Sequence, residues 1–188
     1  GHARVYDWNG SSWVQRSNDI DGQSAADYSG QSVSISDDGN TMALSSPGNN
    51  SNGNDSGHVR IFTWSGTAWI AVGNPIVGES AEDQINNVSI SADGETIAVG
   101  ATGNDGNGAD SGHVRVYNWN GTAWTQIGDD INGEAAGDMS GYSVAPSDAG
   151  DTVAIGAPAN DGSGSNAGHV RLYDWNGTAW VQRGADLD

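Results

Sequence analysis

The chain has 188 residues, of which 24 are acidic and six are basic, so its formal net charge is −18 with His counted as neutral. This balance argues against a nucleic-acid partner, because phosphate neutralisation needs clustered Lys and Arg. The absence of Cys excludes disulfides and thiolate metal sites, and no apolar run reaches the roughly 18 residues that membrane insertion needs.

Residues 2–15 predict the first β-hairpin in the chain. Its turn is Asn9-Gly10, a pair that favours a two-residue reversal between antiparallel strands. Counting outward from such a turn places Tyr6 opposite Trp13. The same turn predicts the equivalent pairs Phe62–Trp69, Tyr117–Trp124 and Tyr173–Trp180.

Residues 32–46 predict a second hairpin, in which an Asp38-Gly39 turn pairs Ile35 with Met42. Apolar residues alternate with Ser and Ala along this segment, so one face of the hairpin is bulky and the other is small. The other pairs predicted in this way are Val33–Leu44, Ile90–Ile97, Val88–Val99 and Val144–Ile155.

The two hairpins belong to a unit that repeats every 55 or 56 residues. Gly-His-Ala-Arg at Gly1 returns as Gly-His-Val-Arg at Gly57, Gly112 and Gly168. Repeats of this length are typical of propellers and solenoids, and solenoid coils are usually shorter and contain fewer tight hairpins. The chain begins and ends inside a unit, so we expect it to be part of a longer protein.

Four antiparallel strands per unit predict an all-β fold built of β-propeller blades, with about 3.5 blades in a single array over residues 1–188. A closed propeller generally needs at least four blades, so we expect the chain to associate with further blades or with other copies. The predicted parts are a half blade with its linker at 1–30 and blades at 31–74, 86–129 and 141–183.

Three motifs of the unit carry a family resemblance. They are Gly156-Ala157-Pro158, the segment Gly141–Val144, and the strand Gly112–Tyr117. Together they resemble the FG-GAP repeat, the blade of the integrin-alpha-type β-propeller, over essentially the whole chain. Members of that family often carry an Asp-rich calcium loop between the first two strands. Here that loop is a bare Asp-Gly or Ala-Gly turn, so calcium is not expected there.

The loops that join the two hairpins are rich in oxygen ligands, at 49–55, 104–110 and 160–166. A hard cation such as calcium could use these oxygens, with Gly allowing the bend. The favoured alternative is a polar turn, since Asn, Asp, Gly and Ser are the usual turn residues. The candidate calcium ligands are Asp55, Asp105, Asp110 and Asp161.

Three other sets of residues recur with the unit. An Asp between consecutive units either pairs with an Arg of the Gly-His-x-Arg segment or accepts backbone donors in a turn. The four His residues stand on separate blades and cannot converge on one ion, so we expect each ring to pack or bond locally. These sets are Asp27, Asp83 and Asp138; Arg4, Arg60, Arg115 and Arg171; and His2, His58, His113 and His169.

A Trp precedes each outer turn, at Trp8, Trp64, Trp119 and Trp175. Exposed aromatic side chains beside Asp and Asn could form a glycan site. The stronger alternative is that these side chains fill the space between blades, where Arg can stack on them.

The sequence contains no Cys nucleophile, no Gly-x-Ser-x-Gly or His-Glu-x-x-His motif and no phosphate loop with its Lys. We therefore predict that the chain is not an enzyme. A distant alternative is a hydrolase or lyase propeller whose active site lies in further sequence. The predicted function is that of an extracellular or cell-surface module with a structural or adhesion role, assembling into a surface structure or filament. The main alternative is a glycan-binding propeller.

Overall fold

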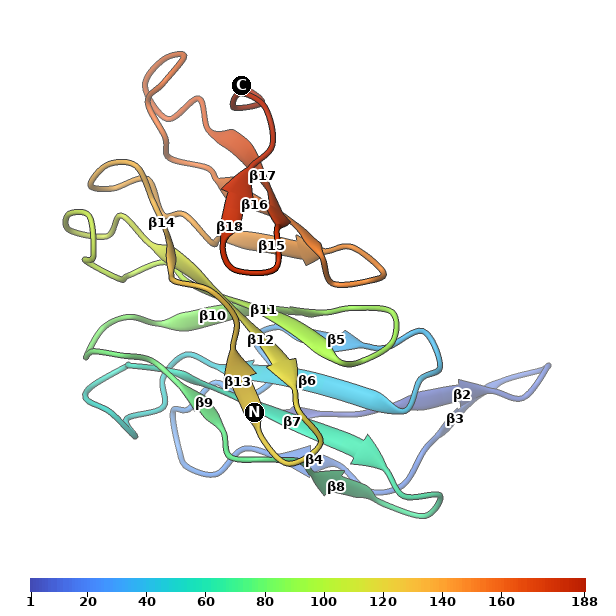
Figure 1. The fold of residues 1–188 in the computed structure, drawn as a ribbon. Helices are drawn as coiled ribbons and strands as arrows, with labels where there is room; N and C mark the ends of the chain where they lie inside the picture. Colours follow the sequence, from blue (N-terminus) through green and yellow to red (C-terminus); the bar gives the residue numbers. More distant parts are fainter.

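A computed structural model describes residues 1–188, and Figure 1 shows a chain built of strands and loops. Three antiparallel sheets follow one another, and in each the strands lie in sequence order. The chain has no helix that is long and apolar enough to span a membrane. The first complete sheet comprises β5 (Val33–Ile35), β6 (Thr41–Ser46), β7 (His58–Trp64) and β8 (Trp69–Ala71). The prediction of an all-β fold made of four-stranded blades is confirmed.

The second and third blades repeat this order. The second comprises β10 (Ile85–Ile90), β11 (Thr96–Ala101), β12 (His113–Trp119) and β13 (Trp124–Gln126). The third comprises β15 (Ser143–Pro146), β16 (Thr152–Ala157), β17 (His169–Trp175) and β18 (Trp180–Gln182). The first 21 residues form two short ladders, β1 (His2–Ala3) with β4 (Ile20–Asp21), and β2 (Tyr6–Trp8) with β3 (Trp13–Gln15).

The inner hairpin of each blade has the predicted register. Ile35 pairs with Met42, and the equivalent pairs in the later blades are also those expected. The turn itself differs from a two-residue type I′ turn, because only its Gly has a positive φ, as at Gly39. The Gly39 N–H donates to the Ser36 carbonyl, and the Ser36 N–H donates to the Thr41 carbonyl.

The outer hairpin has a register two residues away from the prediction, which was wrong here. Trp8 pairs with Trp13, and Tyr6 pairs with Gln15. The Asn9 carboxamide oxygen accepts the N–H groups of both Ser11 and Ser12 at 2.9 Å, which makes the loop four residues long instead of two. A shift of two leaves every side chain on its expected face. The other observed pairs are Trp64–Trp69, Trp119–Trp124 and Trp175–Trp180.

A further short strand that the sequence pattern did not predict lies at the end of each unit. Besides β4, these are β9 (Ile76–Val77) and β14 (Ile131–Asn132). β9 pairs with the beginning of β7, and β14 with the beginning of β12. Each buries its Ile side chain, and in the last unit an isolated bridge between Val170 and Leu187 takes the same place.

Consecutive blades bury one another's inner strands. Val88 and Ile90 of β10 pack in one apolar cluster with Ala43 of β6 and with Ile61 of β7. The Ser34 hydroxyl of β5 accepts the Ile90 N–H at 3.1 Å, so polar edge groups are also satisfied across this seam. We call this contact between two consecutive units the seam.

The four-residue outer loop generates a stability prediction. Asn120 accepts the N–H groups of Thr122 and Ala123, as Asn9 does in the first unit. We expect Asn120→Ala to lower the free energy of unfolding by about 1 kcal/mol, because two exposed hydrogen bonds lose their acceptor. Urea unfolding measures the change, and Asn120→Asp, which keeps an acceptor oxygen, is the matched control. Equal stability of both variants and the parent chain would contradict the role given to this side chain.

Candidate functional site

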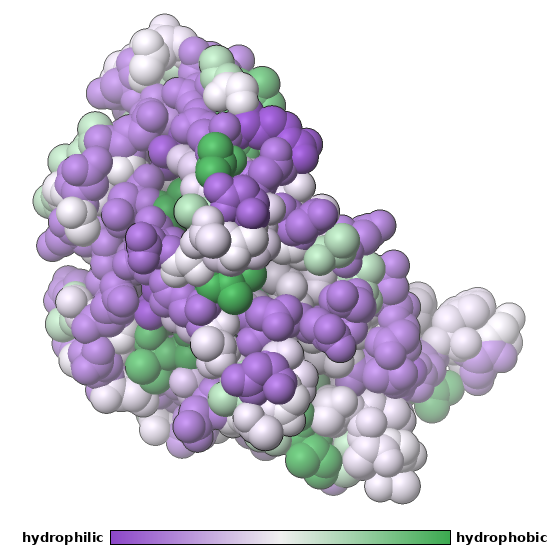
Figure 2. Space-filling model, in the orientation of Figure 1, coloured by the Kyte–Doolittle hydropathy of each residue, from purple (hydrophilic) through white to green (hydrophobic).

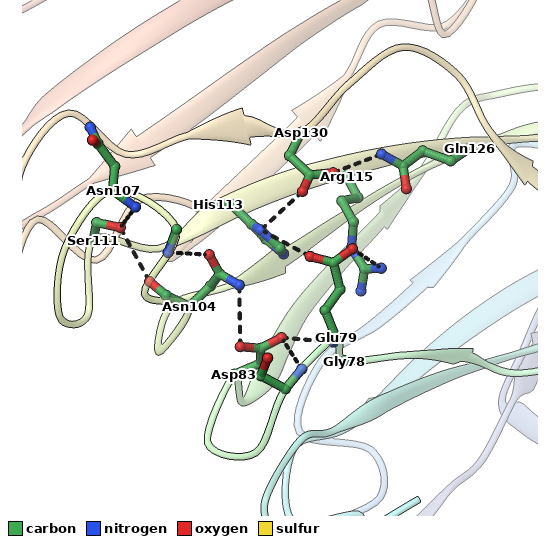
Figure 3. Close-up of polar contacts among 12 residues, drawn as sticks. Gly78, Glu79, Asp83, Asn104, Asn107, Ser111, His113, Arg115, Gln126 and Asp130 are labelled. Carbon is green, nitrogen blue, oxygen red and sulfur yellow. Dashed lines mark hydrogen bonds and ion pairs between the residues drawn. The ribbon is translucent and has the colours of Figure 1, made fainter. Parts of the chain in front are cut away.

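The recurring Asp between units closes a turn. In Figure 3, the Asp83 carboxylate accepts the N–H groups of Glu79 and Ser80, at 2.7 and 3.0 Å, and the Asn104 side-chain amide at 3.2 Å. Asp27 and Asp138 are bound in the same way by a backbone N–H and an Asn side chain. Of the two roles that the sequence left open, the structure therefore shows the turn and not the Asp–Arg pair.

The recurring Arg reaches across the seam to a backbone carbonyl. Arg115 donates to the Val77 carbonyl at 2.8 Å, and its guanidinium lies over the Tyr117 ring, 5.7 Å from the ring centroid. Arg60 and Arg171 make the equivalent bonds to the carbonyls of Asp21 and Asn132. Since Val77 belongs to β9, which pairs with β7, this Arg joins the second blade to the first. Arg4 differs and forms a two-bond ion pair with Asp19.

The Trp pairs of the later units also lie on the seam. Trp124 packs against the apolar cluster between the first two blades, and the Trp180 indole N–H donates to the Ile127 carbonyl at 2.9 Å. Only the pair in the first unit is largely free, with Trp8 55% and Trp13 66% exposed. Among the glycan candidates, Trp64, Trp119 and Trp175 are thus half-buried, whereas Trp8 is exposed.

The contact between Gly128 and the next Trp pair gives a second prediction. Gly128 and Gly184 share a φ of 74°, but a Cβ on Gly128 would lie 2.8 Å from Trp175 and 2.9 Å from Trp180, while one on Gly184 would meet nothing. We expect Gly184→Ala to cost about 1 kcal/mol through backbone strain, and Gly128→Ala to cost roughly 1–3 kcal/mol more through overpacking. Thermal and urea unfolding measure the stability of both variants. An equal loss of stability would show that Gly128 is not packed tightly against the Trp pair at the seam.

The hairpin-joining loops bind their own backbone. The Asp105 carboxylate accepts the Asp110 N–H at 2.9 Å, and Asp161 accepts the Asn166 N–H at 2.7 Å. Asp55 donates its N–H to the Asn50 side chain. Calcium binding at Asp55, Asp105, Asp110 and Asp161 stays a prediction, while the observed bonds are those of the polar-turn alternative.

The structure brings together two clusters that the sequence analysis did not group. In each, a His at the start of a blade's third strand faces two carboxylates from other segments, and Figure 3 shows the one around His113. The first cluster is His113, Glu79 and Asp130, and the second is His169, Glu134 and Asp186. Burial, aided by the positive charge of Arg115, lowers the pKa of His113 to about 4, so this imidazole is neutral at pH 7. Burial raises the pKa of Glu79.

The unit that precedes these two clusters, which contains His58, lacks both carboxylates. At the places of Glu79 and Asp130 it has Gln23 and Pro75, so His58 has no acidic partner of this kind. The His58 side chain is buried, and burial together with Arg60 lowers its pKa, against a smaller opposing effect of Asp27.

The buried His58 gives a pH prediction. Its pKa is lower in the folded chain than the ordinary 6.5 of an unfolded one, so the unfolded state binds the proton first as the pH falls. The stability from the neutral ring is therefore complete above about pH 6.5 and declines below it. We expect His58→Leu to show a shallower loss of stability between pH 7 and 5 than the parent chain in urea titrations. Identical slopes would contradict this.

One face of the first blade has no blade over it. Val33 and Ile35 are 56% and 44% exposed, whereas their counterparts Val88 and Ile90 are 3% and 7% exposed. Figure 2 shows a mainly hydrophilic surface with separate apolar patches on the side in view. A groove of about 250 Å³ lies at this uncovered face, and its lining residues are Arg4, Val5, Tyr6, Val33, Ser34, Ile35 and Met42.

The edge of β2 beside this groove is also free. β7 pairs with β6 on one side and with β8 on the other, but its counterpart β2 pairs only with β3. The first unit thus holds the outer strands of a blade and has room for the inner ones. An unpaired strand edge next to an exposed apolar face is a site for strand addition.

No known family pattern and no curated protein matches the sequence. Solved structures are similar in fold. A putative 6-phosphogluconolactonase from Bacteroides uniformis aligns over 83% of this chain and 40% of its own, with a TM-score of 0.56 and 13% identity. TolB from Acinetobacter baumannii aligns over 95% and 36%, with a TM-score of 0.50 and 15% identity. An acylaminoacyl peptidase from Pyrococcus horikoshii aligns over 97% and 28%, with a TM-score of 0.51 and 12% identity.

These similarities show the fold, a row of β-propeller blades, and the chain spans two fifths or less of each of these structures. They also correct one prediction. The chain was expected not to be an enzyme, but two of these similar structures are named as a lactonase and a peptidase. Blades of this kind therefore occur in proteins named as enzymes, and the lack of a familiar nucleophile motif does not exclude catalysis. At identities this low, neither activity transfers to this chain.

Proposed function

We propose that the chain is a structural repeat module of an extracellular or cell-surface β-propeller of the FG-GAP type. Its uncovered first face receives the inner hairpin of a further blade. The observation that carries the proposal is the exposure of Val33 and Ile35. Their counterparts Val88 and Ile90 in the second blade, and Val144 in the third, are buried where a preceding blade is present. The FG-GAP assignment and the location are supported by the motif resemblance.

The chemistry of the occupant follows from the seams already present. At the seam between the first two blades, Val88 and Ile90 are covered by a surface of Ala and branched apolar side chains on β6 and β7. An inner hairpin with the alternation of residues 32–46 would provide such a face. It would also pair its outer strand with the free edge of β2, so apolar burial and backbone hydrogen bonds would act together.

A peptide of residues 85–102, which comprises β10 and β11, is a direct probe of this site. We expect it to bind the intact chain in a fluorescence anisotropy titration. The double variant Val33→Glu/Ile35→Glu should bind at least tenfold more weakly, because two carboxylates would lose water without gaining partners.

The matched control is Ile70→Glu, which places the same charge at a side chain 50% exposed on the outer strand β8. This variant should bind the peptide as the parent chain does. Absence of binding to the parent chain, or equal binding by all three proteins, would refute the proposed docking of a hairpin.

A second candidate function, glycan binding, is favoured by one observation. The Trp8 and Trp13 rings lie 5.6 Å apart at a tilt of 58° and are the most exposed pair, which provides an aromatic platform. A glycan array tests it: signals that vanish in Trp8→Ala support this function, and an array without signals rejects it.

A further inference from the structure

We propose that His113, Glu79 and Asp130 bind one divalent transition-metal ion of the zinc type, and that His169, Glu134 and Asp186 bind a second. Each ion would bridge two consecutive units across their seam. This inference does not depend on the docking of a further blade.

The distances within each cluster fit a shared ion better than direct bonds. His113 Nδ1 lies 4.0 Å from Glu79 Oε2 and 3.8 Å from Asp130 Oδ2, which is too far for hydrogen bonds. Ligand atoms around a tetrahedral zinc ion stand about 3.4 Å apart when each bond is about 2.1 Å. A small inward movement of two partly exposed carboxylates would therefore complete the coordination.

The second cluster repeats these distances independently. His169 Nδ1 lies 3.7 Å from Glu134 Oε2 and 3.8 Å from Asp186 Oδ2. His nitrogen and carboxylate oxygen are both zinc ligands, and three protein ligands leave a fourth position of a tetrahedral ion for water.

The His113 ring supplies the observation that points to a ligand. Its side chain is only 1% exposed, and neither Nδ1 nor Nε2 has a hydrogen-bond partner. A buried polar nitrogen without a partner costs free energy, so the observed arrangement lacks a group that this ring could bind. In Figure 3 the ring points toward Glu79 and Asp130. A neutral imidazole is also the form that binds a metal ion.

Neighbouring Gln and Arg side chains orient the carboxylates of each cluster. The Gln126 side-chain amide donates to Asp130 Oδ1 at 2.7 Å, which leaves Oδ2 facing His113. Arg115 lies 3.6 Å from Glu79 Oε1, which leaves Oε2 facing the same ring. The second cluster has the same pattern, with Gln182 on Asp186 at 2.7 Å and Arg171 near Glu134 at 3.9 Å. Partners of this kind typically fix the direction of metal ligands.

The ligands of each cluster come from two units. Glu79 directly follows β9 and Gly78, and β9 is paired with the preceding blade, whereas His113 and Asp130 belong to the following one. A bound ion would therefore hold the connection between units against the blade that follows it, and metal binding would stabilise the folded array.

The test is a calorimetric titration of the metal-stripped chain with Zn²⁺. We expect two ions per chain, one ion after His113→Ala or after His169→Ala, and none after both changes. His58→Ala should leave two, because its unit has Gln23 and Pro75 where the carboxylates would be. Absence of zinc heat, or two ions bound after both His changes, would overturn the proposal.

Two further variants address the case in which a buried His cannot be replaced without unfolding. Glu79→Gln and Asp130→Asn change partly exposed side chains, so circular dichroism should stay unchanged while zinc affinity at the first site falls at least tenfold. Unchanged affinity in both would refute the site. A Ca²⁺ titration distinguishes these centres from the hairpin-joining loops. Any heat from calcium binding to those loops should be the same in the parent chain and in the His and Glu79 variants.

Discussion

Burial of the inner strands against the preceding blade is the constraint on which the rest of this structure depends. A four-stranded blade has two faces, and small residues such as Ala43 and Ala98 let the next sheet come close. Gly100 shows how close, since a Cβ there would lie 2.0 Å from the Gly141 carbonyl oxygen. Apolar burial between units therefore requires both a small face and a bulky one in every repeat, which explains the alternation that all three inner hairpins share.

The hydrogen bonds across the seam depend on the same close packing of consecutive blades. Few cations are available in a chain with six basic residues and a net charge of −18, and three of them are used at equivalent places, Arg60, Arg115 and Arg171. Each binds a backbone carbonyl of the preceding unit and covers an aromatic ring of its own. Glu79 and Asp130 therefore have one guanidinium near them, that of Arg115 at 3.6 Å from Glu79, so a bound cation would balance the remaining negative charge.

How far the sequence predicts this molecule depends on the range of the interactions. The inner register is predictable because the Asp-Gly turn and the alternation of side chains agree. The outer register is not, because Asn9 binds two N–H groups of its own loop, a preference that a two-residue turn rule ignores. The His clusters join segments 34 residues before and 17 residues after His113. The only signal was that Glu134 and Asp186 keep nearly the same offsets from His169.

The short strands β9 and β14 have a consequence for where one unit ends. β14 pairs with the beginning of β12 and buries Ile131 on its own blade. Its last residue, Asn132, supplies a carbonyl for Arg171 of the next blade, and the segment that follows β14 supplies Glu134. A piece cut at the boundaries that the sequence predicts for the second blade, residues 86–129, would lose β14 at its end. It would also lose the acceptor for Arg115 at its beginning. The natural segment for excision or transplantation is thus an overlapping one, longer than the sequence period.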